Sequence, residues 1–268
     1  MDAKLLQEKF ARMGARLRVG EPDRRRAPRD LPLTLDVRSD ARGEFFDVGL
    51  RPGAAVEVDV LDLRKRERHL LLMAREGGEK SLYLCGHDER HWFVAAVPER
   101  AGAANVATAM EALKPREVLE AQARQGVKGK DRRRRKNAAY RRQGEWFFLP
   151  TPFLKVDKKL VLRNEPLSRG NGGKPHWAEL CYRRGGVDVY VCDEYPAGVL
   201  PADYQGLLRA NPKAKTWSWR RMRRNPEAFV KGRIRHPDHA TIRLDVWHRV
   251  AMNTEGQARA MWHVVFLD

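Results

Sequence analysis

The chain has 268 residues, 42% of them hydrophobic, which suits one large or two small globular domains. No apolar run approaches the ~18 residues that a membrane span needs, and the charged start lacks the apolar core of a secretory signal. Three cysteines, Cys85, Cys181 and Cys192, are too few for a disulfide framework and suit a reducing compartment. We therefore expect a cytoplasmic protein without a membrane partner.

Positive charge dominates the composition. There are 53 Lys and Arg against 35 Asp and Glu, a net charge of +18, and 38 of the 53 cationic residues are Arg. Such an excess favours a polyanionic partner, because cationic side chains release counterions from phosphates. The alternative is a solvated surface from an arginine-rich proteome. Because the charge is clustered, we expect the partner to be nucleic acid, either RNA or DNA.

Residues 1–100 are predicted to form an N-terminal part with a helix and an antiparallel sheet. Apolar residues recur at helical spacing over 4–18, and a basic, proline-bearing linker follows at 21–30. Alternating apolar runs then predict strands at 33–37, 55–63, 68–75, 81–86 and 91–97.

Residues 101–142 are predicted to be a basic helical connector. The pattern over 105–126 is helical and can break at Pro115, since proline cannot donate a backbone hydrogen bond. The run KGKDRRRRKNAAYRR (128–142) holds nine Lys or Arg and one Asp. We expect it to be an exposed linker or helix that contacts phosphates through Arg132, Arg133, Arg134, Arg135 and Lys136.

Residues 143–268 are predicted to form a β-rich C-terminal part. Strand-like runs occupy 145–150, 176–184, 187–192, 228–235, 240–252 and 260–267, and a short helix with Pro at its start occupies 201–211. Gly185-Gly186 stands between two of these strands and predicts a hairpin there. The expected fold class is α+β, with antiparallel sheets, a few helices and two parts joined by the basic helical segment.

The last hairpin carries the segment HPDH at its tip. Alternation of apolar residues requires a loop with an odd number of residues, since a one-residue slip would turn each apolar face outward. We expect Ile234 to pair with Ala240 and Val230 to pair with Leu244. The same alternation places His248 on the apolar face, as a core histidine with one satisfied nitrogen.

Two imidazoles and a carboxylate meet at this tip. His236 and Asp238 fall in the loop, and His239 lies beside it on the polar face. Such a set can hold a metal ion or move protons at a phosphodiester. A polar turn is the alternative, because H-x-x-H outside a helix is a weak signature. We take His236, Asp238, His239 and His176 as candidate catalytic residues, with a divalent metal on His236 and His239.

Two further segments suit phosphate binding. The Gly-rich stretch NEPLSRGNGGKPHW (164–177) lets backbone amides approach an anion, although it lacks the G-K-[ST] ending of a Walker A loop. Lys174, Arg243 and Arg249 would hold phosphate near the histidines. The stretch KTWSWRRMRRN (215–225) interleaves aromatic and cationic side chains, which suits base stacking, although a core tryptophan with solvated arginines fits as well. The candidates in it are Trp217, Trp219, Arg220, Arg221, Arg223 and Arg224.

The stretch CGHDERHW (85–92) forms a second polar tip between two apolar strands. Cys85, His87 and His91 could bind zinc with a fourth ligand, although no C-x-x-C pair supports them. The alternative is a hairpin loop in which Asp88 and Glu89 offset nearby arginines.

The C-terminal half resembles a group of small, uncharacterised bacterial and phage-borne proteins. The segments that carry the resemblance are RQGEWFFLP (142–150), GNGGKPH (170–176) and HPDHATIRLDVWHRV (236–250). In that group we expect a Q-G-D opening, a G-H-x-H loop and an H-x-x-H hairpin. This chain has Lys174-Pro175-His176 where G-H-x-H would stand, so one histidine is missing. The resemblance implies that the histidine loops belong together, and it transfers no activity.

These observations predict a nucleic-acid-binding protein, with a lean towards a His- or metal-dependent nuclease. One alternative is a non-catalytic accessory subunit that meets protein partners in a nucleoprotein complex. Another is a small-molecule metal enzyme with an incidental basic surface. Histidines close together would favour an enzyme, and dispersed histidines with one continuous basic face would favour the accessory subunit.

Overall fold

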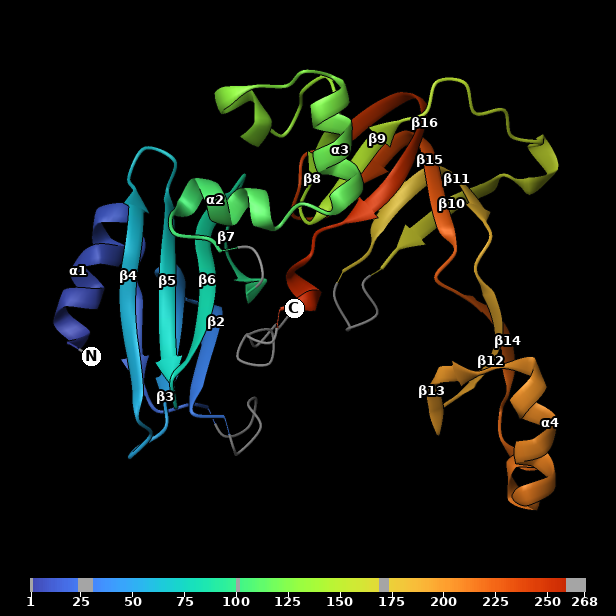
Figure 1. Ribbon diagram of the computed structural model, residues 1–268, viewed down its shortest axis with the longest axis horizontal. Coiled ribbons are helices and arrows are strands. Elements are labelled where there is room, and N and C mark those ends of the chain that lie inside the picture. The colour runs from blue at the N-terminus through green and yellow to red at the C-terminus, as the bar shows by residue number, and fades with distance from the viewer. Residues whose placement is uncertain (1, 24–30, 100–101, 169–173, 259–268) are drawn as a thin grey trace.

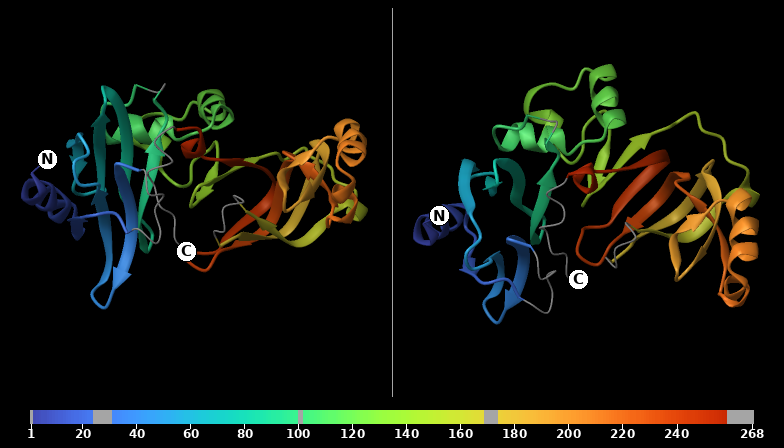
Figure 2. Two further views of the ribbon diagram at one scale, coloured as in Figure 1. Left: turned by 90° about the horizontal axis from the view of Figure 1, so that it is seen from below. Right: turned by 60° about the horizontal axis from the view of Figure 1, so that its bottom comes forward.

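The computed structural model describes residues 2–23, 31–99, 102–168 and 174–258. Two β-rich halves stand side by side, and a smaller arm extends from the far end of the second half (Figures 1 and 2). The fold is α+β with mostly antiparallel sheets, as expected. The strand predicted at 260–267 and most of the linker at 21–30 lie outside the described residues. No helix in the described ranges is long and apolar enough to cross a membrane.

The N-terminal half is a sandwich of two sheets covered by a helix. Helix α1 (Ala3–Met13) ends at Gly14, whose φ of 83° is left-handed, so it is shorter than predicted. Strands β1 (Leu17–Gly20), β2 (Leu33–Asp40) and β3 (Gly43–Leu50) form one sheet in the order β1-β3-β2. Strands β4 (Val56–Arg64), β5 (His69–Glu76), β6 (Glu79–Asp88) and β7 (His91–Val97) form the other, antiparallel sheet.

The single antiparallel sheet expected here is therefore two sheets, and β1 pairs with β3 in parallel. Strand β3 was missed because glycines and charges interrupt its apolar pattern. The facing sheets bury one core between them, in which Phe46 and Leu35 of one sheet meet Leu72 and Tyr83 of the other. All four side chains are at most 1% exposed, so hydrophobic burial holds the sandwich closed.

The connector packs against both halves. Helices α2 (Val106–Ala112) and α3 (Arg116–Arg124) are separated at Pro115, as predicted. Helix α2 covers the outer face of the β4–β7 sheet, and α3 packs against the C-terminal half. Short 3₁₀ turns lie at Gly129–Arg133, Lys158–Leu160, Pro212–Thr216 and Glu255–Gln257.

The basic run is not a uniformly exposed segment, which corrects the sequence-based expectation. Arg132 is partly buried and donates to Glu111 at 2.8 Å. Arg135 reaches the N-terminal half and pairs with both Asp88 and Glu89. The run was expected to face solvent because of its charge, but carboxylates on α2 and on the β6–β7 turn neutralise these two arginines.

The C-terminal half is a six-stranded antiparallel sheet in the order β10-β11-β15-β16-β9-β8. Its strands are β8 (Arg141–Gln143), β9 (Trp146–Pro150), β10 (Leu162–Leu167), β11 (His176–Arg184), β15 (Glu227–Arg235) and β16 (Ile242–Met252). One face packs Phe148, Leu167 and Ile234 into a single cluster, although β9 and β10 are not neighbours in the sheet. His248 is 7% exposed with Nδ1 2.8 Å from the Val246 carbonyl, which confirms it as a core histidine.

The arm consists of β12 (Val187–Cys192), β13 (Tyr195–Val199), β14 (Arg220–Arg224) and helix α4 (Pro201–Ala210). The hairpin predicted at Gly185-Gly186 is wrong. Strand β11 pairs with β15, and β12 pairs with β14, so the two glycines bend a long two-stranded ribbon from one sheet into the next. Both have positive φ, and a Cβ on Gly186 would lie 2.9 Å from the Arg224 carbonyl oxygen.

In the β15–β16 hairpin the number of residues between Ile234 and its partner is odd, as predicted, but the partners of Ile234 and Val230 differ from the predicted ones. Ile234 pairs with Ile242, so seven residues separate this pair instead of the five that pairing with Ala240 would leave. Val230 pairs with His248 because the register shifts between Val230 and Gly232. Between these two pairs β15 has one residue and β16 has three, so an irregularity of two extra residues lies in β16, which the alternation argument did not include.

We predict that Arg135→Gln lowers the free energy of unfolding by about 1–2 kcal/mol, because it leaves two partly buried carboxylates short of a cation. Arg134→Gln is the matched control, since the Arg134 side chain is 60% exposed and pairs with the exposed Asp131 three residues before it. Urea denaturation of both variants measures the difference. Equal stability of the two variants would contradict the ion-pair account.

Candidate metal centre

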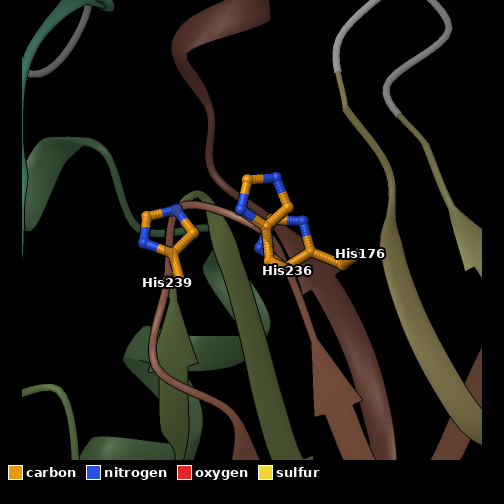
Figure 3. A group of neighbouring side chains, drawn as sticks. All are labelled: His176, His236 and His239. Atoms are coloured by element: carbon orange, nitrogen blue, oxygen red, sulfur yellow. The ribbon is translucent and has the colours of Figure 1, made fainter.

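Three histidines converge at the end of the C-terminal sheet that faces the N-terminal half. His176 begins β11, and His236 and His239 lie on the β15–β16 loop (Figure 3). One ring nitrogen from each lies within 4.8 Å of the others. The ring centroids are 4.2 Å apart for His176–His236 and 4.7 Å apart for His236–His239. The sequence pointed to all three residues, and the structure brings them together.

His176 is the most buried member of the trio, at 1% exposure, and neither of its ring nitrogens has a hydrogen-bond partner among the residues that the structure describes. A buried polar group left unsatisfied costs about 1–3 kcal/mol, so native proteins rarely keep one without a reason. Burial, followed by the neighbouring His236 and His239, lowers the pKa of His176 to about 3. The ring is therefore neutral, which is the form that binds a metal ion.

His236 is held by contacts that fix which nitrogen keeps a lone pair. Its Nε2 lies 3.2 Å from the Lys174 carbonyl oxygen, and its Nδ1 accepts from the Asp238 amide at 3.2 Å. Nε2–H therefore donates, and the Nδ1 lone pair accepts from the Asp238 amide, so a metal ion on Nδ1 would replace that hydrogen bond. Burial, followed by the charge of His239, lowers the pKa of His236. The Asp238 carboxylate is held separately by Lys174 Nζ at 3.1 Å.

His239 has a carboxylate behind it. Glu89 Oε2 lies 3.5 Å from His239 Nδ1, which is an ion-pair distance, and this nitrogen makes no hydrogen bond within the described residues. The same Glu89 oxygen accepts from the Ala240 amide at 2.8 Å. Burial lowers the pKa of His239, with the negative charge of Glu89 opposing that shift. A carboxylate behind a ligating histidine commonly orients the ring and raises its basicity.

The segment Arg142-Gln143-Gly144 closes the site from the β8–β9 turn. Gln143 is 1% exposed and donates from Nε2 to the Ala240 carbonyl at 2.6 Å. Gly144 has φ of 56°, and a Cβ there would lie 2.9 Å from His239 Nε2 and 3.4 Å from His176 Nε2. Only glycine leaves room for both imidazoles at this point.

A cavity of about 500 Å³ opens beside the trio and has walls from both halves. This volume lies in the range of small-molecule and cofactor sites. His236 and His239 line it together with Lys174 and Arg142. The carboxylates that line it are Asp36, Glu44, Asp88, Glu145, Asp238 and Glu255. The cavity therefore combines imidazoles, carboxylates and a few cations, which are the groups that metal binding and proton transfer use.

The other predicted phosphate-binding residues lie elsewhere. Neither Arg243 nor Arg249 lines the cavity; Arg243 is 80% exposed beside Asp245, and Arg249 pairs with Glu227 at the far end of the sheet. The basic run does not reach the cavity wall except through Arg142. The arm holds the remaining residues, Trp217, Trp219, Arg220, Arg221, Arg223 and Arg224.

The zinc set considered at residues 85–92 is not assembled. Cys85 is fully buried in the sandwich core, and the trio is the one group of potential metal ligands that the described residues bring together. Asp88 and Glu89 offset arginines, as the alternative stated. Sequence reasoning missed Glu89, Gln143 and Gly144 as supports of the histidines, although it had singled out both segments that contain them.

Comparisons of the chain with protein-family models, with curated proteins and with solved structures find no match. The chemistry of the site therefore has to be inferred from its own geometry.

We predict that Gly144→Ala weakens binding of Zn²⁺ or Co²⁺ at least tenfold, because its methyl group would displace His239 and His176. Gly126→Ala is the matched control, since Gly126 has a similar φ of 61° and, apart from its chain neighbours, no described residue has an atom within 4 Å of the point that its Cβ would occupy. Both variants carry the same left-handed strain of about 1–2 kcal/mol. Isothermal titration with the metal separates them, and equal affinity would show that Gly144 does not shape the site.

Proposed function

We propose that this protein binds one divalent transition-metal ion on His176, His236 and His239 and hydrolyses a phosphodiester bond in nucleic acid. The observation that carries the proposal is the buried His176 ring, which lies beside two other imidazoles and whose two nitrogens lack hydrogen-bond partners within the described part of the chain. Three histidines with a free fourth position form a common donor set of catalytic zinc sites. We also propose a reducing, cytoplasmic setting, which the three free, buried cysteines support.

A metal ion bound there would polarise a phosphoryl oxygen and make water a better nucleophile. Side chains of the protein can supply the groups that bind the substrate and orient the water. Lys174 and Arg142 line the cavity and can neutralise an anionic substrate. The Asp238 carboxylate, held by Lys174, lies beside the trio and can accept a hydrogen bond from an attacking water.

The arm supports a polymeric substrate. Every residue of β14 is exposed, and four of its five residues are Arg. Beside it, aromatic side chains gather, with Tyr195 5.9 Å from both Trp217 and Trp219 between ring centroids. Strand β11 runs from His176 of the trio to the arm, and its nine residues span about 26 Å at ~3.3 Å per residue. A nucleic-acid strand reaching from one to the other would pass about eight phosphates at ~3.4 Å each.

A small-molecule metal enzyme is the second candidate. It is favoured by the cavity, which has a small-ligand volume and more carboxylates than cations among its lining residues. The basic surface would then be incidental. A non-catalytic accessory subunit gains less support, because the histidines cluster at one point instead of dispersing.

The first test measures metal and turnover. We expect the purified protein to retain about one equivalent of Zn²⁺, Mn²⁺ or Co²⁺ and to cleave a labelled RNA or DNA oligonucleotide. His176→Ala should lose both the metal and the activity, because it removes one of three ligands. His87→Ala, which contacts Trp92 and lies outside the trio, is the control. Mass spectrometry of the metal and gel assays decide the outcome, and a wild-type protein with neither property contradicts the proposal.

The second test concerns the polymer. We expect sub-micromolar affinity for a 20-nucleotide strand at low salt, falling steeply as salt rises. The double variant Arg220→Gln, Arg224→Gln should flatten the slope of log K against log salt by about 1.4–1.8, at ~0.7–0.9 per lost phosphate contact. The double variant Arg12→Gln, Arg116→Gln removes the same charge from exposed helical positions and serves as the control. Fluorescence anisotropy measures both, and identical slopes would exclude the arm as the binding surface.

A further inference from the structure

A second pair of polar residues lines the same cavity from the N-terminal half. His91, the first residue of β7, places Nδ1 2.6 Å from Glu44 Oε1 on β3. The other oxygen of Glu44 accepts from the Trp92 amide at 2.8 Å, which fixes the carboxylate. His91 and Glu44 both line the cavity and belong to the half of the chain that does not carry the three-histidine site. Neither residue belongs to the proposed metal-binding trio.

The geometry of this pair is that of a histidine oriented by a carboxylate. With Nδ1–H donating to Glu44, the ring has one settled tautomer, and Nε2 is left to exchange a proton. A carboxylate at this position holds the imidazole in one orientation, as it does in hydrolase triads. The His91 side chain is 46% exposed, so a substrate in the cavity can reach it.

The β6–β7 turn fixes this pair relative to the histidine trio. Glu89, two residues before His91, contacts His239 and the Ala240 amide. Asp88 on β6 is the strand partner of His91 on β7. Its carboxylate forms ion pairs with Arg135 and Arg142. The turn is thereby held against the C-terminal half at the point where β7, and with it His91, begins.

We propose that His91 is the general acid of the reaction and that Glu44 is its positioning residue. This inference rests on the proposed phosphodiester hydrolysis. The water oxygen forms a bond to phosphorus and its proton goes to solvent. The bond from phosphorus to the leaving oxygen breaks, and the electron pair stays on that oxygen. The leaving oxygen takes the proton from His91 Nε2, and solvent then reprotonates His91.

The experiment compares two substrates that differ in their need for an acid. The leaving group of an oligonucleotide is an alkoxide, which needs a proton. The leaving group of bis(p-nitrophenyl) phosphate is p-nitrophenolate, which is stable without one. We expect His91→Ala to lose about 10²–10⁴-fold in kcat on the oligonucleotide and less than tenfold on the aryl ester. Its metal content should match that of the wild type. Glu44→Gln should shift the ratio of the two rates in the same direction by a smaller factor.

Two further variants make the result decisive. The side-chain amide of the His91→Gln variant can still donate a hydrogen bond to Glu44, but it cannot act as an acid. If His91 transfers a proton to the leaving group, this variant should therefore behave like His91→Ala. His87→Ala should keep the wild-type ratio of rates. Equal losses on both substrates, loss of metal, or wild-type rates in His91→Gln each overturn the inference and leave the proposed hydrolysis standing. A wild-type protein that cleaves neither substrate overturns the proposed function, and the general-acid role falls with it.

Discussion

The site depends on the docking of two carboxylates of the β6–β7 turn against the C-terminal half. Asp88 forms ion pairs with Arg135 and Arg142, and Glu89 pairs with Arg135 and contacts His239. These groups are partly buried, so removing one partner would leave a poorly solvated charge. Glu89 has φ of 52°, a left-handed conformation that turns the chain sharply at this point. The contact joins the two halves, braces the histidine loop and closes the cavity.

The histidine loop needs this bracing because it is not a tight turn. Residues 235–241 separate the last paired residues of β15 and β16, and a loop of that length has many conformations of its own. Side chains from three distant segments hold it: Gln143 on the Ala240 carbonyl, Glu89 on the Ala240 amide and Lys174 on Asp238. Gly144 then leaves the space in which the rings of His176 and His239 approach each other. These contacts position the imidazoles, which would lower the entropic cost of binding a ligand there.

Three elements of the proposed function lie in different parts of the fold. The C-terminal sheet carries the imidazole trio at one end of β11 and the arginine-rich arm at the other. The N-terminal sandwich contributes the Glu44–His91 pair and the second wall of the cavity. Neither half alone contains the whole site. Helices α2 and α3, each packed on a different half, hold the two walls together.

Much of the fold follows from local sequence. The break between α2 and α3 at Pro115, the helix that starts at Pro201 and the strand at 91–97 appear where the sequence predicts them. Proline chemistry and apolar periodicity act over a few residues, so they can be recognised directly in the sequence. Strands β3 and β14 escaped prediction because glycine or arginine obscures their alternation, and their partners rather than their own propensity make them strands.

The candidate site was also predictable from the sequence only in part. Residue type and strand alternation were enough to select His176, His236 and His239 and to bury His248. Their convergence required the tertiary structure, because the contacts that produce it span long stretches of chain. Glu89 contacts Arg135, which is 46 residues away in the sequence, and the amide of Ala240, which is 151 residues away. Ion pairs and close backbone approaches depend on distance in space, and sequence periodicity carries no information about which distant charges will meet.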